Sequence, residues 1–412
     1  MRAGIAGLPR VLMLARHFRR SGARASTGPG GSVRHLSTHG YDPVVVTATA
    51  EHRDRWEPRD DDLVERVPAE VPVHRVRSPA APSHSRLDRA RGLPPPWVRS
   101  WVAESTWLGI EAGRDAQLIY ASCVPYETAF AGARVAQELK RPWIADLEDP
   151  WALDEMRVPL SRWHRAADLG RMRRALATAS AVVMAAPEAA ERVRAAMPEL
   201  ASRVAVVAIP IGFEVSDFGA GIAPPQDGIF RVVHTGSLHT DFGEHLRRTR
   251  LRRRLMGGMA PGLDVLARSH VFLVEALAQL IASQPALEAC LELHLAGELA
   301  PADRAASEGH AFVRTPGLLR HRDTIALMRS ADLLFLPMQD LPAGTRAGLI
   351  PYKTYEYLAA GRPILAAVPD RDVRDMLAPL SRATLVRPSD VGAMAAAVAA
   401  RVAAAAAAPR RA

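Results

Sequence analysis

Short apolar runs that alternate with longer helical patterns constrain the fold of this chain more than any other feature of its sequence. Runs rich in Val, Leu, Ile and Ala recur through the 412 residues, and the segments between them carry apolar residues at helical spacing. This alternation is the signature of βαβ units, in which helices cover a parallel sheet. We therefore predict an α/β fold with mainly parallel sheets.

The expected strands fall into two series along the chain. The first series comprises residues 10–15, 42–47, 71–76, 118–121, 143–146, 181–185 and 204–208, and the second comprises 230–234, 291–296, 312–315, 333–337, 363–367 and 384–386. Residues 214–228 between the two series are rich in Gly, Pro and Asp, as is typical of a linker. Since 412 residues exceed one ordinary core, we predict two Rossmann-like domains, residues 1–215 and 216–412.

The composition indicates a folded, soluble protein with a basic surface. The net charge of +9 attracts nucleic acid, anionic membranes or phosphorylated small molecules, although an arginine- and alanine-rich composition with a solvated basic surface explains it equally well. Cys123 and Cys290, the two cysteines, have neither metal nor disulfide spacing. No apolar run is long enough to span a bilayer. We expect a cytoplasmic protein whose membrane contacts, if it has any, are peripheral.

The stretch 351–365 carries the most specific chemistry. A helix over 353–360 is expected to end at Gly361, where a residue without a Cβ suits the left-handed position after a helix. Lys353 and Glu356 are three residues apart and therefore share one helix face. The free N–H groups at the start of the helix suit a diphosphate, and a carboxylate one turn later suits the hydroxyls of a ribose.

This stretch resembles the nucleotide-sugar site of family 4 glycosyltransferases, in which a lysine-containing turn precedes a Glu-x-x-x-x-Gly helix. Other segments agree in order: 293–298, 316–319 and 328–337 in the second half, and the glycines 28, 30 and 31, the Asp-x-x-Asp-Pro-Trp element at 146–151 and the turn at 209–213 in the first half. The resemblance implies a GT-B fold, with two Rossmann-like domains facing a cleft. It also implies a retaining reaction that needs no metal and no cofactor besides the nucleotide-sugar co-substrate.

The family pattern assigns roles to individual positions. It implies a nucleotide-sugar site at Gly236, Arg346, Lys353 and Glu356, a glycine-rich loop at Gly30 and Gly31, and a catalytic carboxylate at Asp149. For Asp149, which we expect to orient an acceptor hydroxyl, a structural or helix-capping role stays open. The position where many members carry a second glutamate is Gly348, so we assign the contacts to the donor sugar to Arg346 and the backbone after it.

Two segments lie outside the alternating pattern. Trp97 and Trp101 recur at helical spacing, which fits either core packing or contact with an acceptor or a membrane surface. Six arginines crowd between Arg247 and Arg254, in what looks like an insertion after the first strand of the second domain. They are candidates to neutralise the donor diphosphate, and a solvated surface loop is an equal alternative. Together with the segment Trp97 to Trp107, they are also expected to serve an acceptor carried by an anionic membrane or a lipid phosphate.

We predict a glycosyltransferase that moves a sugar from a nucleotide-sugar donor to an unidentified acceptor, in the synthesis of a cell-surface polysaccharide, glycolipid or glycoconjugate. The expected acceptor is a glycan, a lipid-linked molecule or a small molecule, and an anionic membrane surface is a further expected partner. The alternatives are a nucleotide-sugar 2-epimerase, whose chemistry needs several acidic and histidine groups in the cleft, and a non-enzymatic polyanion-binding protein. Because no aromatic residues interleave with the arginines, we expect no nucleic-acid partner.

Overall fold

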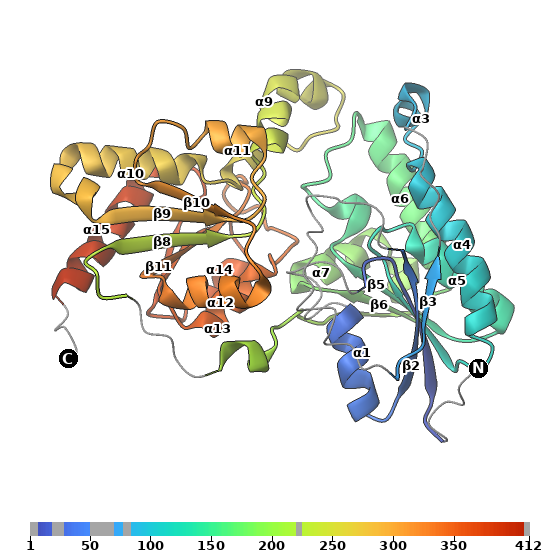
Figure 1. The fold of residues 1–412 in the computed structure, drawn as a ribbon. Helices are drawn as coiled ribbons and strands as arrows, with labels where there is room; N and C mark the ends of the chain where they lie inside the picture. The colour runs from blue at the N-terminus through green and yellow to red at the C-terminus, as the bar shows by residue number, and fades with distance from the viewer. Residues whose placement is uncertain (1–6, 19–28, 50–69, 77–83, 220–224, 408–412) are drawn as a thin grey trace. The chain divides into compact units, whose positions relative to one another are not determined.

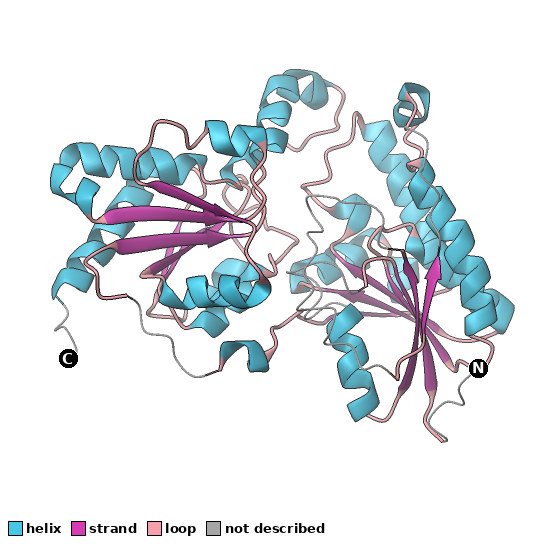
Figure 2. Ribbon diagram, viewed as in Figure 1, coloured by secondary structure: helices cyan, strands magenta, loops and turns pink. Residues whose placement is uncertain are grey.

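A computed structural model describes residues 7–18, 29–49, 70–76, 84–219 and 225–407 of the chain. The chain divides into two compact units, Met1–Ile211 and Gly212–Ala412, and each consists of helices around a parallel sheet (Figures 1 and 2). The predicted boundary between residues 215 and 216 falls in the short 3-10 helix η2 (Val215–Phe218), which belongs to the second unit. Gly28 lies outside the described residues.

The first unit is built on a seven-stranded sheet in the order β3-β2-β1-β4-β5-β6-β7. Its strands are β1 (Arg10–Ala15), β2 (Asp42–Ala48), β3 (Val73–Val76), β4 (Leu118–Ser122), β5 (Trp143–Glu148), β6 (Ala181–Met184) and β7 (Ala205–Ala208). Its helices are α1 (Pro29–Thr38), α3 (Arg86–Ala90), α4 (Pro96–Ala112), α5 (Thr128–Leu139), α6 (Arg162–Leu176), α7 (Pro187–Ala196), α8 (Pro198–Ala201) and the 3-10 helix η1 (Trp151–Leu153). Every strand pair in it is parallel.

Strand β1 shows why the strands of this sheet are continuous apolar runs. Val11 and Met13 pack with Val33 of α1 on one face. Leu12 and Leu14 point to the other face, where they approach Gly109 of α4. A strand that is covered on both faces buries every side chain, so the alternation of polar and apolar residues seen in half-exposed sheets disappears.

The second unit repeats the arrangement with six strands in the order β10-β9-β8-β11-β12-β13. Its strands are β8 (Phe230–Thr235), β9 (Leu291–Ala296), β10 (Val313–Gly317), β11 (Leu333–Pro337), β12 (Ile364–Ala367) and β13 (Ala383–Val386). Its helices are α9 (Thr240–Leu255), α10 (Val271–Ser283), α11 (Pro301–Ala305), α12 (His321–Ser330), α13 (Lys353–Ala360), α14 (Asp372–Leu377) and α15 (Val391–Ala407), with the 3-10 helices η3 (Val265–Ala267) and η4 (Pro285–Ala289). All of its strand pairs are parallel as well.

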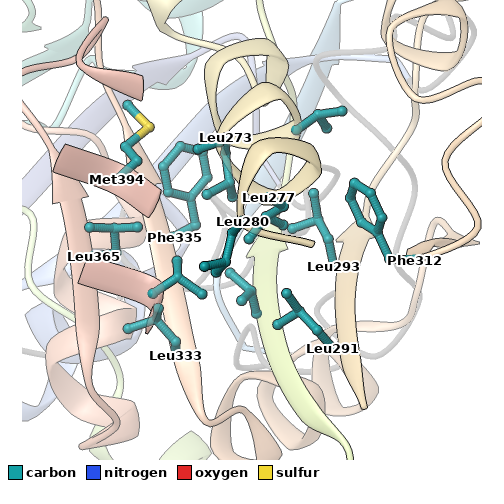
Figure 3. Packing of buried hydrophobic residues seen from close by; sticks show 14 of the residues in the cluster. Leu273, Leu277, Leu280, Leu291, Leu293, Phe312, Leu333, Phe335, Leu365 and Met394 are labelled. Atoms are coloured by element: carbon teal, nitrogen blue, oxygen red, sulfur yellow. The ribbon is translucent and has the colours of Figure 1, made fainter. Parts of the chain in front are cut away.

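The core of the second unit lies between its sheet and the helices α10 and α15 (Figure 3). Leu273, Leu277 and Leu280 of α10 pack against leucines of β9 and β11 and against Phe335. Met394 and Val398 extend the same cluster from α15. Helices α12 and α13 lie on the opposite face of the sheet (Figure 1). Each sheet therefore has the doubly wound order in which the strands to either side of a central pair are added in opposite directions.

The prediction of two α/β domains with parallel sheets is confirmed, and each of the thirteen predicted strands is a strand in the structure. The arginine-rich segment, for which a solvated surface loop was one of the alternatives, forms the 16-residue helix α9. None of the described helices is both long and apolar enough to cross a membrane.

Candidate functional site

The switch point of the second sheet lies between β8 and β11, where the direction of strand addition reverses. Open α/β sheets bind ligands at the carboxyl ends of the strands at such a point. His234, Thr235 and Gly236 stand at that end of β8. The Nδ1 atom of His234 lies 3.1 Å from the carbonyl oxygen of Phe335 on β11, so one side chain joins the two strands at the switch point.

Helix α13 presents two of the predicted site residues at this edge. It spans Lys353–Ala360, as predicted, and Gly361 ends it with φ 70°, the left-handed conformation expected for this glycine. Tyr357 holds the helix against β8, because its hydroxyl oxygen accepts a hydrogen bond of 3.0 Å from the backbone N–H of Thr235. The side chain of Tyr357 is fully buried.

Lys353 lies beside the end of β8. Its Nζ atom is 3.1 Å from Nε2 of His234. A carbonyl oxygen only accepts hydrogen bonds, so Nδ1 of His234 carries the ring proton and donates a hydrogen bond to the carbonyl oxygen of Phe335. Nε2 is therefore free to accept a hydrogen bond from Lys353. Burial, and then the charge of Lys353, hold the pKa of His234 well below its ordinary value, so the ring is neutral at pH 7.

Gly236 leaves open the space next to the lysine. Its φ is +92°, and a Cβ atom built on it would stand 3.4 Å from Nζ of Lys353. A side chain here would therefore be strained and would crowd the amine, whereas glycine lets a ligand approach both the backbone and the amine. Burial, followed by the charge of Arg268, lowers the pKa of Lys353 to about 7, against the opposing charge of Glu356.

Glu356 lies one turn further along α13 and is 5% exposed. Burial raises the pKa of its carboxyl group to about 7, against the opposing charges of His321 and Lys353. Among the described residues we find none that donates a hydrogen bond to this carboxylate. A buried acceptor without protein donors is costly unless a ligand or solvent supplies them.

His321 and Asp217 are near Glu356 and were not predicted from the sequence. His321 begins α12, and its Nε2 atom lies 2.8 Å from Oδ2 of Asp217 in η2. Both side chains are almost completely buried. The two residues are 104 positions apart, so no local sequence pattern signals their contact. His234 did have a local signal, because His234 and Thr235 are polar residues at the carboxyl end of strand β8.

The structure brings Gly236, Lys353 and Glu356 together. Arg346 is exposed in the loop between β11 and α13, and its backbone forms an isolated bridge with Asp370. Gly348, in the same loop, is buried. The donor-sugar contact predicted for Arg346 stays a prediction.

In the first unit, Asp149 directly follows β5. Its neighbours Glu148 and Trp151 both have positive φ, 56° and 45°, which is uncommon for residues other than glycine. The ring of Trp151 stacks on Tyr126 with 5.2 Å between centroids. Strained backbone of this kind clusters at functional sites, so the turn holding Asp149 fits the expected acceptor-side role.

Gly30 and Gly31 occupy the first turn of α1 rather than a loop. The helix begins at Pro29, whose fixed φ and missing N–H suit a first helical position. The predicted glycine-rich loop is therefore corrected to a helix start at these two residues.

Helix α4 carries both buried and exposed tryptophans. Trp101 is fully buried and donates from Nε1 to Oγ1 of Thr128 at 2.9 Å, so it belongs to the core. Trp97 lies under the guanidinium of Arg16, 4.3 Å from the ring centroid. Trp107 is 68% exposed.

The two sheets and their order define the class of protein: the chain has the GT-B fold of two Rossmann-like domains. It is similar in structure to sucrose-phosphate synthase from Thermosynechococcus elongatus, with a TM-score of 0.59, 14% identity, and coverage of 96% of this chain and 90% of that one. It is also similar to HepE of Anabaena in complex with UDP-glucose (TM-score 0.56, 15% identity, 96% and 90% covered). A putative UDP-N-acetylglucosamine 2-epimerase from Listeria monocytogenes shares the fold (TM-score 0.52, 14% identity, 96% and 88% covered).

A sequence match within the second unit narrows this class. Residues 263–403 match the family model described as Glycosyl transferases group 1. The match includes Lys353 and Glu356 and ends within α15. No curated protein matches the chain. The second unit therefore carries a glycosyltransferase group 1 domain.

Proposed function

We propose that this protein is a glycosyltransferase that takes a sugar from a nucleotide-sugar donor, and that the donor nucleotide binds the second unit at Gly236, Lys353 and Glu356. The observation that carries the proposal is the buried carboxylate of Glu356, which has no protein hydrogen-bond donor among the described residues and lies one helical turn from Lys353. A ribose supplies two hydroxyl donors for such a group, and the attached diphosphate supplies an anion for the buried amine of Lys353, whose pKa burial and Arg268 lower.

The chemistry follows from where charge develops. When the bond from the sugar anomeric carbon to the diphosphate breaks, negative charge grows on the departing phosphate oxygen. Lys353 and the amino end of α13 stabilise that charge. The acceptor hydroxyl oxygen forms the new bond on the same face of the sugar, and its proton passes to the departing phosphate. This step retains the anomeric configuration and requires no metal or cofactor.

We also assign roles to Asp149 in the first unit and Arg346 in the second. Asp149 orients the acceptor hydroxyl from the strained turn after β5. Arg346, on the loop before α13, contacts the donor sugar. We further propose that the acceptor belongs to the synthesis of a cell-surface polysaccharide, glycolipid or glycoconjugate and that the protein works peripherally at the inner face of the cell membrane.

Binding of nucleotide sugars tests the donor site. The HepE structure contains UDP-glucose on the same fold, so UDP-sugars are the first donors to titrate, followed by GDP- and ADP-sugars, with thermal unfolding as the readout. We expect one donor class to raise the unfolding temperature of the wild type and to have little effect on Glu356→Ala or Lys353→Met. Glu275→Ala, which alters an exposed glutamate of α10, is the matched control and should respond like the wild type. Unchanged donor affinity in Glu356→Ala would show that the nucleotide binds elsewhere.

The same donor distinguishes the two enzyme classes. A transferase or its slow hydrolysis side reaction releases the nucleoside diphosphate, and NMR of the product gives the anomeric configuration. A 2-epimerase leaves the sugar attached and changes the configuration at carbon 2. Formation of an epimer without release of nucleoside diphosphate would replace the transferase proposal by the epimerase alternative.

A further inference from the structure

The carboxyl-terminal half of α9 is a projecting helix with exposed apolar and basic side chains. Its amino-terminal half is anchored, because Gly243 and Leu246 are buried and Gly243 lies directly against the backbone of Leu266. Beyond this anchor, Leu251 is 74% exposed and Leu255 is 79% exposed. Exposed leucines one helical turn apart do not contribute to the core of the second unit, so folding alone does not account for them.

The arginines of this half differ in the support that they receive from the fold. Arg247 pairs with Asp264 at 2.5 Å, and Arg248 pairs with Glu244. In the described part of the chain, by contrast, no carboxylate pairs with the exposed arginines at 250, 252 and 254. Like charges four residues apart, such as Arg250 and Arg254, destabilise a helix. A segment that keeps them is therefore expected to have an anionic partner.

The helical positions place the leucines between the arginines. At about 100° per residue, Leu251 and Leu255 lie about 40° apart on the helix surface. Arg248 and Arg252 flank them on one side, and Arg247 and Arg254 flank them on the other. This is the pattern of a helix that lies in a membrane interface, with apolar side chains inserted and basic side chains at the lipid headgroups.

We propose that residues 247–256 of α9, the arginine–leucine surface, dock this protein on an anionic membrane. A nucleic acid would neutralise the arginines and leave the leucines in water. A second copy of the same surface would place arginines against arginines. An anionic bilayer satisfies both kinds of side chain. The inference rests on the peripheral location included in the proposed function and assigns the membrane contact to α9.

Co-sedimentation of the full chain with vesicles tests the proposal without any need for glycosyl transfer. We expect binding to phosphatidylcholine vesicles that contain phosphatidylglycerol, weak binding to pure phosphatidylcholine vesicles, and loss of binding as salt is raised. Changing the three unpaired arginines to glutamine (Arg250→Gln, Arg252→Gln and Arg254→Gln) should weaken binding at least about tenfold. The double variant Leu251→Ser and Leu255→Ser should weaken it as well, with an unchanged unfolding temperature.

A charge-matched control separates a local surface from net charge. Arg141→Gln, Arg174→Gln and Arg203→Gln remove three exposed arginines from the first unit and lower the net charge equally. This control should bind like the wild type. The proposal is overturned if the control loses as much binding as the α9 variant, if the leucine variant binds anionic vesicles undiminished, or if the wild type binds neutral and anionic vesicles alike. None of these outcomes bears on donor binding at Glu356.

Discussion

Replacing Glu356 by glutamine should make the protein less sensitive to pH, because the buried carboxyl group ionises at a cost in the folded state. Its pKa is raised from 4.5 to about 7. One pKa unit corresponds to ~1.4 kcal/mol, so the folded wild type loses about 3 kcal/mol of stability as pH rises from below 4.5 to above 7. The sign follows because the folded state keeps a proton that the unfolded chain has already released. Glutamine has nearly the same shape and does not ionise.

Urea unfolding at pH 4.5 and pH 8 measures this difference. The free energy of unfolding of Glu356→Gln, relative to the wild type, should increase by about 3 kcal/mol between the two pH values, whatever constant offset the amide introduces. The comparison is repeated on a Lys353→Met background, which removes the titration of the neighbouring amine. Glu275→Gln, at an exposed position, is the control and should follow the wild type. Parallel pH profiles for Glu356→Gln and the wild type would refute the raised pKa of this buried carboxyl group.

Three further substitutions test other contacts. His234→Phe removes the hydrogen-bond acceptor of Lys353 and should weaken binding of UDP or another recognised nucleoside diphosphate by roughly tenfold in calorimetry. Tyr41→Phe, a conservative change at an exposed residue of the first unit, is the control. Unchanged affinity in His234→Phe would mean that His234 does not position the amine. Gly243→Ala places a Cβ 2.4 Å from the Cα of Leu266 and should lower the free energy of unfolding in urea by about 1–3 kcal/mol. The control is Gly170→Ala in α6, whose Cβ meets only ordinary contacts, and equal effects of the two substitutions would contradict the close packing of α9. Trp101→Phe should lower the free energy of unfolding by about 1–2 kcal/mol, because the hydrogen bond to Thr128 is lost. Trp107→Phe, at an exposed site, should leave the free energy of unfolding almost unchanged, and equal effects of the two substitutions would argue against the buried position of Trp101.

The fold was predictable because burial on both sheet faces leaves a strong local record. Residues such as Val11 to Leu14 have to be apolar without interruption, and a glycine such as Gly361 is required where the backbone turns left-handed. These requirements act on neighbouring residues and can be recognised in a single sequence. The helix α13 was predicted to the residue for this reason.

The helix of the arginine segment was not predicted, because it lacks the apolar periodicity on which such a prediction depends. Arginine is a good helix former, and only Thr240, Gly243 and Leu246 of the 16 residues are buried. A helix that is polar almost all round has the same sequence signature as a surface loop. Its character therefore becomes clear only when the buried and exposed positions are known.

The candidate site was only partly predictable, since its members come from distant segments. Lys353 and Glu356 share one short helix, so their spacing was informative. His234, Asp217 and His321 join them through contacts over more than 100 residues, which a single sequence does not record. The first unit gave fewer signals still, because acceptors differ in chemistry whereas nucleotide donors share a ribose and a diphosphate.

The two titratable groups of α13 are best understood as halves of an interaction that a ligand completes. Lys353 has a pKa lowered to about 7 and Glu356 a pKa raised to about 7, mainly because each is buried with too few partners. A diphosphate favours the charged form of the lysine, and ribose hydroxyls favour the charged form of the glutamate. Nucleotide binding near pH 7 should therefore be accompanied by proton uptake at one group and proton release at the other. The folded protein without ligand is less stable because these groups are buried without enough partners. The donor binds more tightly for the same reason, since the groups that it contacts are already desolvated and positioned.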